Sequence, residues 1–240
     1  MRHPRIRNVV VTDVPRADVA RVDVLAAYGV ATVHEALGRT GYLGPRLRPA
    51  WPGARVGGTA VTALCWPGDN LMIHVAVEQC REGDLLVVAT TSPCADGMFG
   101  ELFATALRHR GVRGVVIDAG VRDVAELRAM GFPAWSAAVS AQGTVKATAG
   151  AVNVPVAIGG QVVRPGDVIL ADDDGVLVVP RGDLERGIAA AGARAAKEAA
   201  TREAFMKGEL GLDRYGLRER LPDLGIVYMT ADEYDRDRSA

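Results

Sequence analysis

Two runs of consecutive apolar residues, each followed by a helical pattern, most constrain the fold of this chain. Residues 85–88 and 115–117 contain no polar side chain, which is typical of strands that are covered on both faces. Helical patterns over 100–110 and 123–130 follow these runs, each is stopped by a glycine, and another strand is expected over 133–139. Strands that alternate with helices in this way predict an α/β fold.

Further elements are expected before this array. The patterns over 18–29 and 31–38 are typical of two short helices, and Thr32 would open the second of them as the first residue of a capping box. A polar turn that ends in Asp69-Asn70 would cap a helix beginning at Leu71, whose apolar residues share one face.

From residue 150 onward the pattern changes to short strands joined by tight turns, which predicts an antiparallel meander. The three aspartates at 172–174 predict a polar hairpin turn. A calcium loop of the EF-hand type is not expected there, because its spaced oxygen ligands and its glycine and glutamate positions are not in place. The strands of the meander are predicted over 154–158, 161–163, 168–170 and 176–179.

The chain is expected to divide into an N-terminal arm over 1–17, a single α/β domain over 18–180 and a C-terminal extension over 181–240. The extension starts with a long helix that is too polar for a protein core. The tail behind it carries apolar side chains that need a surface to cover. Contacts with a second copy of the chain are therefore expected.

Composition excludes several classes of function. The net charge of −1 among 240 residues gives no electrostatic reason to expect nucleic acid or an anionic membrane as a partner. No apolar run has the length of a signal peptide or a membrane span, so the cytoplasm is the expected location. The odd number and wide spacing of the cysteines favour neither disulfides nor a zinc site; they are Cys65, Cys80 and Cys94.

Lysine usage argues against imine chemistry. Only three of the 28 basic residues are lysine, and a Schiff-base enzyme needs a lysine that is desolvated in an apolar pocket. Lys146 lies in a turn flanked by glycine and threonine, while Lys197 and Lys207 lie in the polar C-terminal helix. Activation of a carbonyl group by a metal ion is therefore the better prediction.

Two short motifs carry the candidate chemistry. Gly100 would open a helix whose first free N–H groups can hold an anion. Arg122 and Asp123 follow a buried strand, at the edge of an α/β sheet where ligands collect. Each motif also has a structural interpretation. The glycine could only form a tight turn, and the pair could only cap the next helix and bind Glu101 or Glu126.

The order of these motifs along the chain resembles the 4-hydroxy-4-methyl-2-oxoglutarate / 4-carboxy-4-hydroxy-2-oxoadipate aldolases. These are class II pyruvate aldolases that share a fold with the non-catalytic regulator of ribonuclease E activity A. The resemblance covers about residues 25–230, and it is most specific in GELF, in the Arg-Asp pair and in PGD…DDDGV. It implies an α-β-β-α sandwich of the swivelling β/β/α type, assembled as a homotrimer or homohexamer, with a long C-terminal helical extension.

The resemblance also implies a binding site for a 2-oxo acid. The amides of Leu102 and Phe103 would hold the pyruvate carboxylate beside Gly100, and Arg122 would contact the oxygen that becomes the enolate. Asp123 would ligate Mg²⁺ or Mn²⁺.

Two further acidic residues complete the implied site. Glu101 would reach the metal through water, and Glu198 would enter as a catalytic residue from a neighbouring subunit. The nearby Glu203 is an alternative to Glu198.

These groups suit the cleavage of a 4-hydroxy-2-oxo acid, because a metal and a guanidinium would stabilise the charge that develops on the C2 oxygen. Oxaloacetate decarboxylation would give the same enolate and is an expected side activity. A metal-bound water or hydroxide is the candidate base.

For further substrate carboxylates, Arg39, His74, Arg108 and Arg110 are equally conceivable partners. Non-catalytic binding to a ribonuclease is the alternative function.

Overall fold

The computed structural model describes residues 8–237. Its contacts divide the chain into two units, one that ends at Arg194 and one that begins at Ala195. Within the described residues, no helix is both long and apolar enough to cross a membrane.

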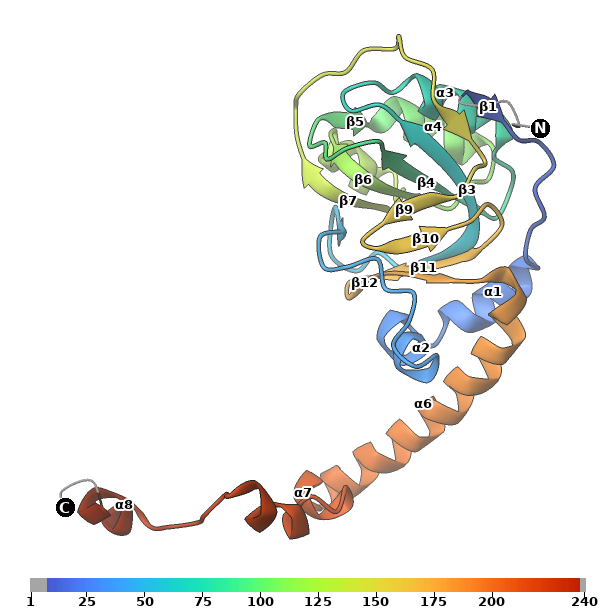
Figure 1. Cartoon of the computed structure of the whole chain (residues 1–240). Helices are drawn as coiled ribbons and strands as arrows, with labels where there is room; N and C mark the ends of the chain where they lie inside the picture. Colours follow the sequence, from blue (N-terminus) through green and yellow to red (C-terminus); the bar gives the residue numbers. More distant parts are fainter. Residues whose placement is uncertain (1–7, 238–240) are drawn as a thin grey trace, which may run out of the picture. The chain divides into compact units, whose positions relative to one another are not determined.

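A ten-stranded mixed sheet forms the centre of the first unit (Figure 1). Its strands are β1 (Val9–Val10), β2 (Arg48–Pro49), β3 (Val56–Cys65), β4 (Asp84–Thr90), β5 (Gly97–Phe99), β6 (Val115–Val121), β7 (Ala134–Val139), β8 (Ala151–Val152), β11 (Val168–Asp172) and β12 (Gly175–Val179). The main path runs β1-β8-β3-β4-β6-β7-β2, in which β3, β4, β6 and β7 are parallel neighbours. The α/β fold predicted from the strand–helix alternation is confirmed.

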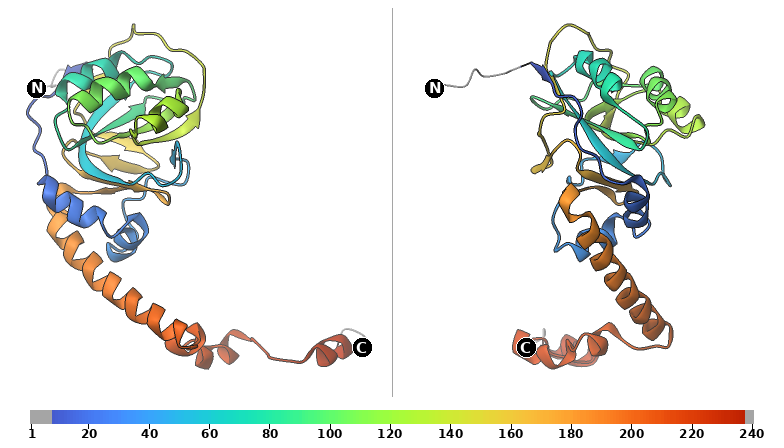
Figure 2. Two further views of the ribbon diagram at one scale, coloured as in Figure 1. Left: turned by 180° about the vertical axis from the view of Figure 1, so that it is seen from behind. Right: turned by 90° about the vertical axis from the view of Figure 1, so that its right-hand side faces the viewer.

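Three helices cover one face of this sheet, as the left view of Figure 2 shows. They are α3 (Leu71–Gln79), α4 (Glu101–His109) and α5 (Val124–Ala129). Successive strand residues point to opposite faces. Leu86 and Val88 therefore pack on the side of the three helices, whereas Leu85 and Val87 pack on the opposite side of the sheet, against a second layer of strands. Burial on both faces explains why this strand is apolar at every one of these positions.

Strands β9 (Val156–Ile158), β10 (Gln161–Val163), β11 and β12 form a second β-layer, which packs against the face of β4 that carries Leu85 and Val87. These four strands pair as two hairpins instead of one meander. The pair β9 and β10 forms a separate antiparallel sheet. Strand β11 pairs with β12 on one side and with β3, not β10, on the other. The predicted meander is wrong in this respect, because β11 finds a long buried neighbour far away in the sequence. The hairpin turn at the three aspartates is confirmed by the pairing of Asp172 with Gly175.

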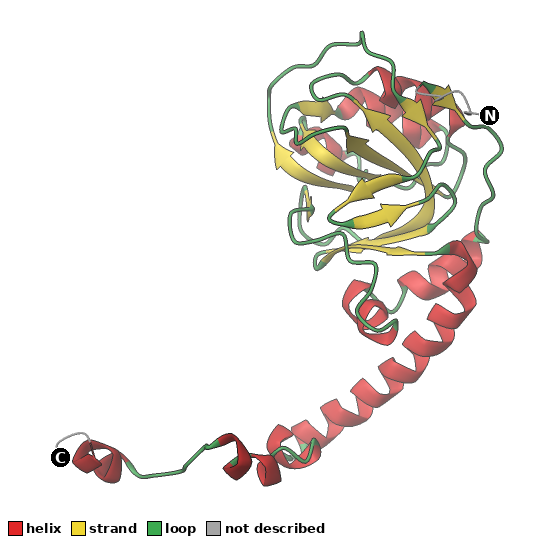
Figure 3. Cartoon of the chain, in the orientation of Figure 1, coloured by secondary structure: helices red, strands yellow, loops and turns green. Residues whose placement is uncertain are grey.

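Helices α1 (Val19–Ala26) and α2 (Val30–Ala36) and the first turns of α6 (Leu184–Met206) pack beneath β11 and β12. This gives the four layers of an α-β-β-α sandwich (Figure 3). A 3-10 turn, Arg181–Asp183, precedes α6. In α6, the residues buried against this layer are Leu184, Gly187 and Ala191.

The start of α2 differs from the predicted capping box. The helix begins at Val30, so Thr32 lies inside its first turn and Gly29 (φ 84°) is the N-cap. The amide of Val30 donates a hydrogen bond of 2.8 Å to Asp172 Oδ2. A side chain from the β11–β12 turn therefore supplies the cap, which no local pattern could indicate.

The N-terminal segment is tied to the sheet at two points. Strand β1 pairs in parallel with β8. Arg16 binds the fully buried Asp84 carboxylate, with 2.9 Å between Arg16 Nε and Asp84 Oδ1. This carboxylate also accepts the amide of Arg81 at 2.7 Å.

The second unit contains short elements and many exposed apolar side chains. After the end of α6 follow α7 (Gly211–Arg214), the 3-10 turns Arg218–Arg220 and Pro222–Leu224, and α8 (Ala231–Asp237). The rings of Phe205 and Tyr215 contact each other edge to face, with centroids 6.2 Å apart. Exposed apolar residues of this unit include Met206, Leu210, Leu224, Val227 and Tyr228.

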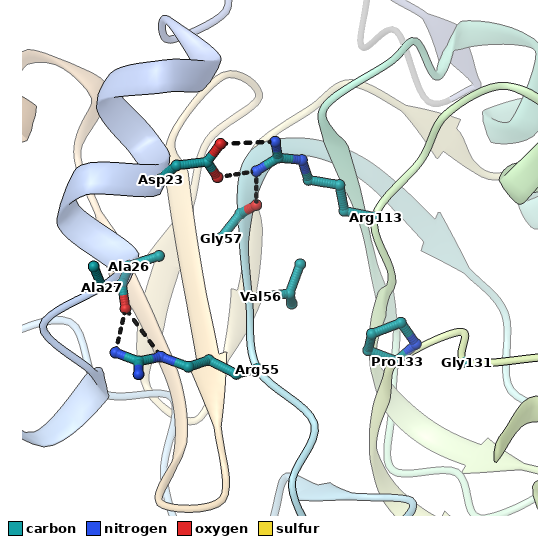
Figure 4. A pocket seen from close by; sticks show the side chains of 9 residues that line it. All are labelled: Asp23, Ala26, Ala27, Arg55, Val56, Gly57, Arg113, Gly131 and Pro133. Carbon is teal, nitrogen blue, oxygen red and sulfur yellow. Dashed lines mark hydrogen bonds and ion pairs between the residues drawn. The ribbon is translucent and has the colours of Figure 1, made fainter.

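An ion pair joins α1 to the loop before β6 (Figure 4). Arg113 Nη2 lies 3.0 Å from Asp23 Oδ2, and Arg113 Nη1 binds both Asp23 Oδ1 and the carbonyl oxygen of Gly57, the latter at 3.0 Å. The hydrogen bond from Arg113 lowers the pKa of Asp23 more than the partial burial of this carboxyl group raises it.

We expect Arg113→Ala to lower the free energy of unfolding by about 1 kcal/mol, since the pair is half exposed and screened by water. A carboxyl group with a lowered folded-state pKa stabilises the protein above its unfolded pKa and loses this effect as the pH falls through the folded value. The difference between wild type and variant should thus hold at neutral pH and shrink below about pH 4. Urea unfolding at both pH values measures it. An equal difference at both would contradict the assignment.

Candidate functional site

The two motifs meet at one edge of the sheet. Strands β5 and β6 are parallel neighbours in which Phe99 and Val121 are register partners. Gly100 and Arg122 are therefore the first residues beyond the same sheet edge, at the carboxyl ends of the strands. The amide of Arg122 donates to the carbonyl oxygen of Phe99 at 2.9 Å and holds the two loops together.

Asp123 has an unusual backbone and an unusual side-chain partner. Its φ of 56° and ψ of 41° lie in the left-handed region, which non-glycine residues seldom occupy and which recurs at functional sites. Asp123 precedes α5, yet its side chain makes no capping bond to that helix. Instead, Asp123 Oδ2 accepts the amide of Glu101 at 3.1 Å, and it lies 3.6 Å from Arg122 Nε.

The absence of a side chain at position 100 makes this arrangement possible. A Cβ atom on Gly100 would lie 2.3 Å from Asp123 Oδ2 and 3.0 Å from Arg122 Cγ. The backbone of Gly100 is extended, with φ −155° and ψ −166°, so the requirement for glycine comes from close approach. Gly100 thus provides the space for the Arg122-Asp123 pair.

We expect Gly100→Ala to reduce any turnover at this site at least about tenfold, because the added methyl group must displace the Asp123 carboxylate. The effect on stability should be smaller, since the alanine is compatible with an extended backbone. Gly182→Ala is the matched control, because a Cβ there meets nothing within 4 Å. Steady-state kinetics with thermal unfolding of both variants measures the difference. Equal turnover in the two variants would contradict this role of Gly100.

The first turn of α4 leaves two amides for a ligand. The first intrahelical bond runs from Ala104 N to Gly100 O, at 3.2 Å, so the preceding amides have no partner within the helix. Asp123 uses the amide of Glu101. The amides of Leu102 and Phe103 lie next in the turn, where the helix dipole favours a negative charge.

A pocket of about 270 Å³ opens beside this turn. It contains four of the residues expected to bind substrate and adds residues from α3 and from the loop after β7. Its lining residues are Asn70, His74, Val77, Gly100, Leu102, Phe103, Ala106, Arg122 and Lys146.

His74 and Lys146 are the basic groups that the fold adds to Arg122 in this pocket. The His74 ring packs against the ring of Phe103, with centroids 4.4 Å apart. Partial burial lowers the pKa of His74, and the nearby charge of Lys146 lowers it further. The neutral form of His74 is therefore more favoured than in a free histidine, and an anion bound beside the ring would favour the protonated form.

Among the four conceivable partners for additional carboxylates, only His74 lines this pocket. The guanidinium groups of the others bind elsewhere: Arg39 to Glu35, Arg108 to the carbonyl of Met130, and Arg110 to the carbonyls of Glu78 and Cys80. Sequence reasoning missed Lys146 as a pocket residue. It lies more than twenty residues from either motif, in a loop without periodicity, so no local signal could identify it.

The acidic residues at the site are suited to a hard cation with few protein ligands. Asp123 is partly exposed beside Gly100. Glu101 is on the first turn of α4, where its Oε1 accepts the Thr105 hydroxyl at 2.7 Å. Among the described residues, no three His, Cys, Asp or Glu side chains group around one point. Mg²⁺ commonly uses one or two carboxylates and keeps several waters, so the Asp123 and Glu101 side chains are candidate ligands for this ion.

Glu198 and Glu203 lie on the part of α6 that belongs to the second unit. Glu198 is half-buried and Glu203 is exposed. Their expected entry into a neighbouring site stays a prediction.

Comparison with protein families adds a decisive observation. The model of the RraA-like family, described as Aldolase/RraA, matches residues 30–178, which include all elements of the pocket. The chain belongs to the RraA-like family.

Two members of the family with curated names are similar in sequence to this chain. It is 29% identical over 169 residues to a Halalkalibacterium halodurans protein, with 70% of this chain and 80% of that protein covered. It is 36% identical over 143 residues to a Burkholderia multivorans protein, with 60% and 87% covered. Both are provisionally named 4-hydroxy-4-methyl-2-oxoglutarate aldolase.

The fold is also that of RraA proteins. The crystal structure of Streptomyces coelicolor RraAS2, described as an unusual member of the RNase ES inhibitor RraA family, superimposes with a TM-score of 0.72 at 28% identity. The match covers 79% of this chain and 99% of that one. The α-β-β-α fold expected from the sequence is confirmed.

Proposed function

We propose that this RraA-like protein is a divalent-metal-dependent pyruvate aldolase. Its substrates would be 4-carboxy-4-hydroxy-2-oxoadipate, 4-hydroxy-4-methyl-2-oxoglutarate or both, with oxaloacetate decarboxylation as a side activity. The observation that carries the proposal is the contact between Gly100, Arg122 and Asp123 at the first turn of α4. In this contact, the turn would bind the substrate carboxylate, Arg122 would supply a fixed cation and Asp123 would ligate the metal. The names of two relatives also support it.

Residues of α4 and the loop after β6 would bind the 2-oxo acid end of the substrate. The amides of Leu102 and Phe103 bind the C1 carboxylate, and the Arg122 guanidinium donates to the C2 oxygen. Cleavage of the C3–C4 bond requires that a base take the C4 hydroxyl proton, so that C4 becomes a carbonyl carbon. The electron pair of the broken bond remains as the enolate of pyruvate, whose charge is on the C2 oxygen, and protonation at C3 then gives pyruvate. Arg122 therefore binds the transition state more strongly than the ground state.

The distal carboxylate of the substrate would lie towards His74 and Lys146. Both line the same pocket as Arg122. A carboxylate bound there would raise the low pKa of His74 and favour its protonated form. This end of the pocket would therefore select 2-oxo acids with a second negative charge.

The residues available for a metal are Asp123 directly and Glu101 through water. When bound, Mg²⁺ or Mn²⁺ would supply Lewis-acid polarisation of the C2 carbonyl. Gly100 keeps the Asp123 carboxylate accessible at this position, since any side chain there would fill its space.

Self-assembly belongs to the same proposal. The second unit exposes large apolar side chains, among them Tyr228, which is 71% exposed, and Val227, which is 72% exposed. A homotrimer or homohexamer would cover such residues and would allow Glu198 to contribute to a neighbouring active site.

Non-catalytic binding to a ribonuclease is the second candidate function. It is favoured by the likeness to RraAS2. The strained Asp123 and its contact with Arg122 favour the enzyme, because a docking surface has no need for a carboxylate held in the left-handed region.

The test is pyruvate release, coupled to lactate dehydrogenase and NADH, from each 4-hydroxy-2-oxo acid and from oxaloacetate. Each reaction is run with Mg²⁺ and with EDTA, and a blank without protein corrects for spontaneous decarboxylation. Metal-dependent release above the blank would support the aldolase. A folded protein that releases no pyruvate from any of the three would contradict it.

A further inference from the structure

The segment between β7 and β8 carries Lys146 but contains little regular structure. Residues 141–149 are almost all exposed, and their one strand-like feature is an isolated bridge between Val145 and Asp69. Two backbone bonds accompany this bridge: Val145 N donates to Gly68 O at 2.9 Å, and Asn70 N donates to Val145 O at 3.0 Å. The position of Lys146 therefore depends on the turn before α3.

The side chain of Asp69 makes this connection much stronger. Asp69 Oδ2 accepts the amides of Ala147 at 2.9 Å and Thr148 at 2.6 Å, directly after Lys146. Asp69 Oδ1 accepts the amide of Leu71 at 2.9 Å, at the start of α3. One carboxylate thus joins the loop of Lys146 to the helix of His74.

The environment of Asp69 favours an ionised carboxylate. The residue is only 3% exposed. Burial alone would raise its pKa, but the amides of Leu71, Ala147 and Thr148 and the Thr148 hydroxyl outweigh it, and the pKa is lowered. A buried negative charge held by several donors gives stronger hydrogen bonds than a neutral acceptor would.

We propose that Asp69 is a positioning residue that fixes Lys146 at the wall of the pocket that Arg122 also lines, and thereby sets the affinity for the distal carboxylate of the substrate. Asp69 does not line the pocket itself and acts through the two amides that follow Lys146. Its effect on substrate rests on the proposed function, whereas its effect on the loop does not.

Trypsin cleavage after Lys146 tests the effect on the loop. A protease needs an extended, released backbone, and the bond to Ala147 is held by Asp69. In Asp69→Asn and Asp69→Ala we expect cleavage at this bond to be at least about tenfold faster than in wild type, followed by mass spectrometry of the peptides. Asp69→Ala removes every acceptor, and Asp69→Asn keeps the shape of the side chain.

Asp167→Asn is the matched control. Asp167 is also a buried aspartate, and it accepts the amides of Arg164 at 2.9 Å and Arg181 at 3.1 Å, in a different part of the fold. This variant should lose comparable stability without faster cleavage after Lys146. Unchanged cleavage in both Asp69 variants, or equal acceleration in the control, would overturn the proposal.

A double-mutant cycle tests the effect on substrate. Asp69→Asn should raise KM for the 4-hydroxy-2-oxo acid about tenfold and change kcat less than about threefold. In a Lys146→Ala background, Asp69→Asn should change KM no further, because the group that it positions is gone. Additive effects of the two substitutions would overturn the proposal. If wild type releases no pyruvate, the proposed function fails, while the trypsin result still decides the role of Asp69 in the loop.

Discussion

Replacement of Arg122 by alanine is expected to reduce kcat for pyruvate release by at least about a hundredfold, which corresponds to about 2.7 kcal/mol of lost transition-state stabilisation. Arg122 is the charged donor of the pocket that lies beside Asp123, with 3.6 Å between Arg122 Nε and Asp123 Oδ2. Its interaction with the substrate strengthens as charge moves to the C2 oxygen. The loss should therefore appear mainly in kcat and less in KM.

Arg122→Lys is the control that separates charge from geometry. A lysine keeps the positive charge but replaces a planar fork of donors by a single ammonium group. We expect only partial recovery of kcat over the alanine variant. Steady-state kinetics with the coupled assay on all three proteins measures this order. Turnover at the wild-type rate in either variant would remove Arg122 from the site of the developing charge.

Replacement of Asp123 by alanine is expected to abolish both Mg²⁺ binding and metal-dependent turnover. Asp123 is the one residue of the site that combines an exposed carboxylate with a left-handed backbone. Alanine removes the carboxylate that would ligate the metal. Mg²⁺ titration by calorimetry and the coupled assay measure the two losses on the same protein.

Asp123→Gly distinguishes a functional role from a structural one. Glycine adopts φ near 56° without strain. We therefore expect the free energy of unfolding of Asp123→Gly to be about 1 kcal/mol higher than that of Asp123→Ala, and both variants to be equally inactive. If Asp123 served only the stability of the fold, both variants would be less stable than the wild type. Mg²⁺-dependent turnover in either variant would refute the assignment of Asp123 as metal ligand.

The fold was largely predictable because its signals are local. The apolar run at 85–88 reflects burial on both faces, and the glycines at 111 and 131 end α4 and α5 at the expected places. The failures involve partners that are distant in sequence. The meander was wrong because β11 pairs with β3, and the capping box was wrong because Asp172 caps α2 across 142 residues.

The candidate site divides in the same way. Sequence indicated the glycine that precedes α4 and the Arg122-Asp123 pair after β6, because a helix N-terminus and a strand end are recognisable in one stretch of chain. The contact between the two motifs, the reason for glycine at position 100 and the recruitment of Lys146 needed the fold. Each depends on a distance through space between segments that no periodicity relates.

The sequence by itself determined the order of strands and helices, the apolar faces that bury them and the residue types available for chemistry, since these follow from side chains a few positions apart. Tertiary structure alone decided which of those residues share a pocket. Parallel pairing of β5 and β6 brings Gly100 to the Arg122-Asp123 pair, and hydrogen bonds to Asp69 bring Lys146 to the same cavity. The physical reason is that long-range backbone pairing and a buried carboxylate act across space, whereas sequence patterns report only neighbours along the chain.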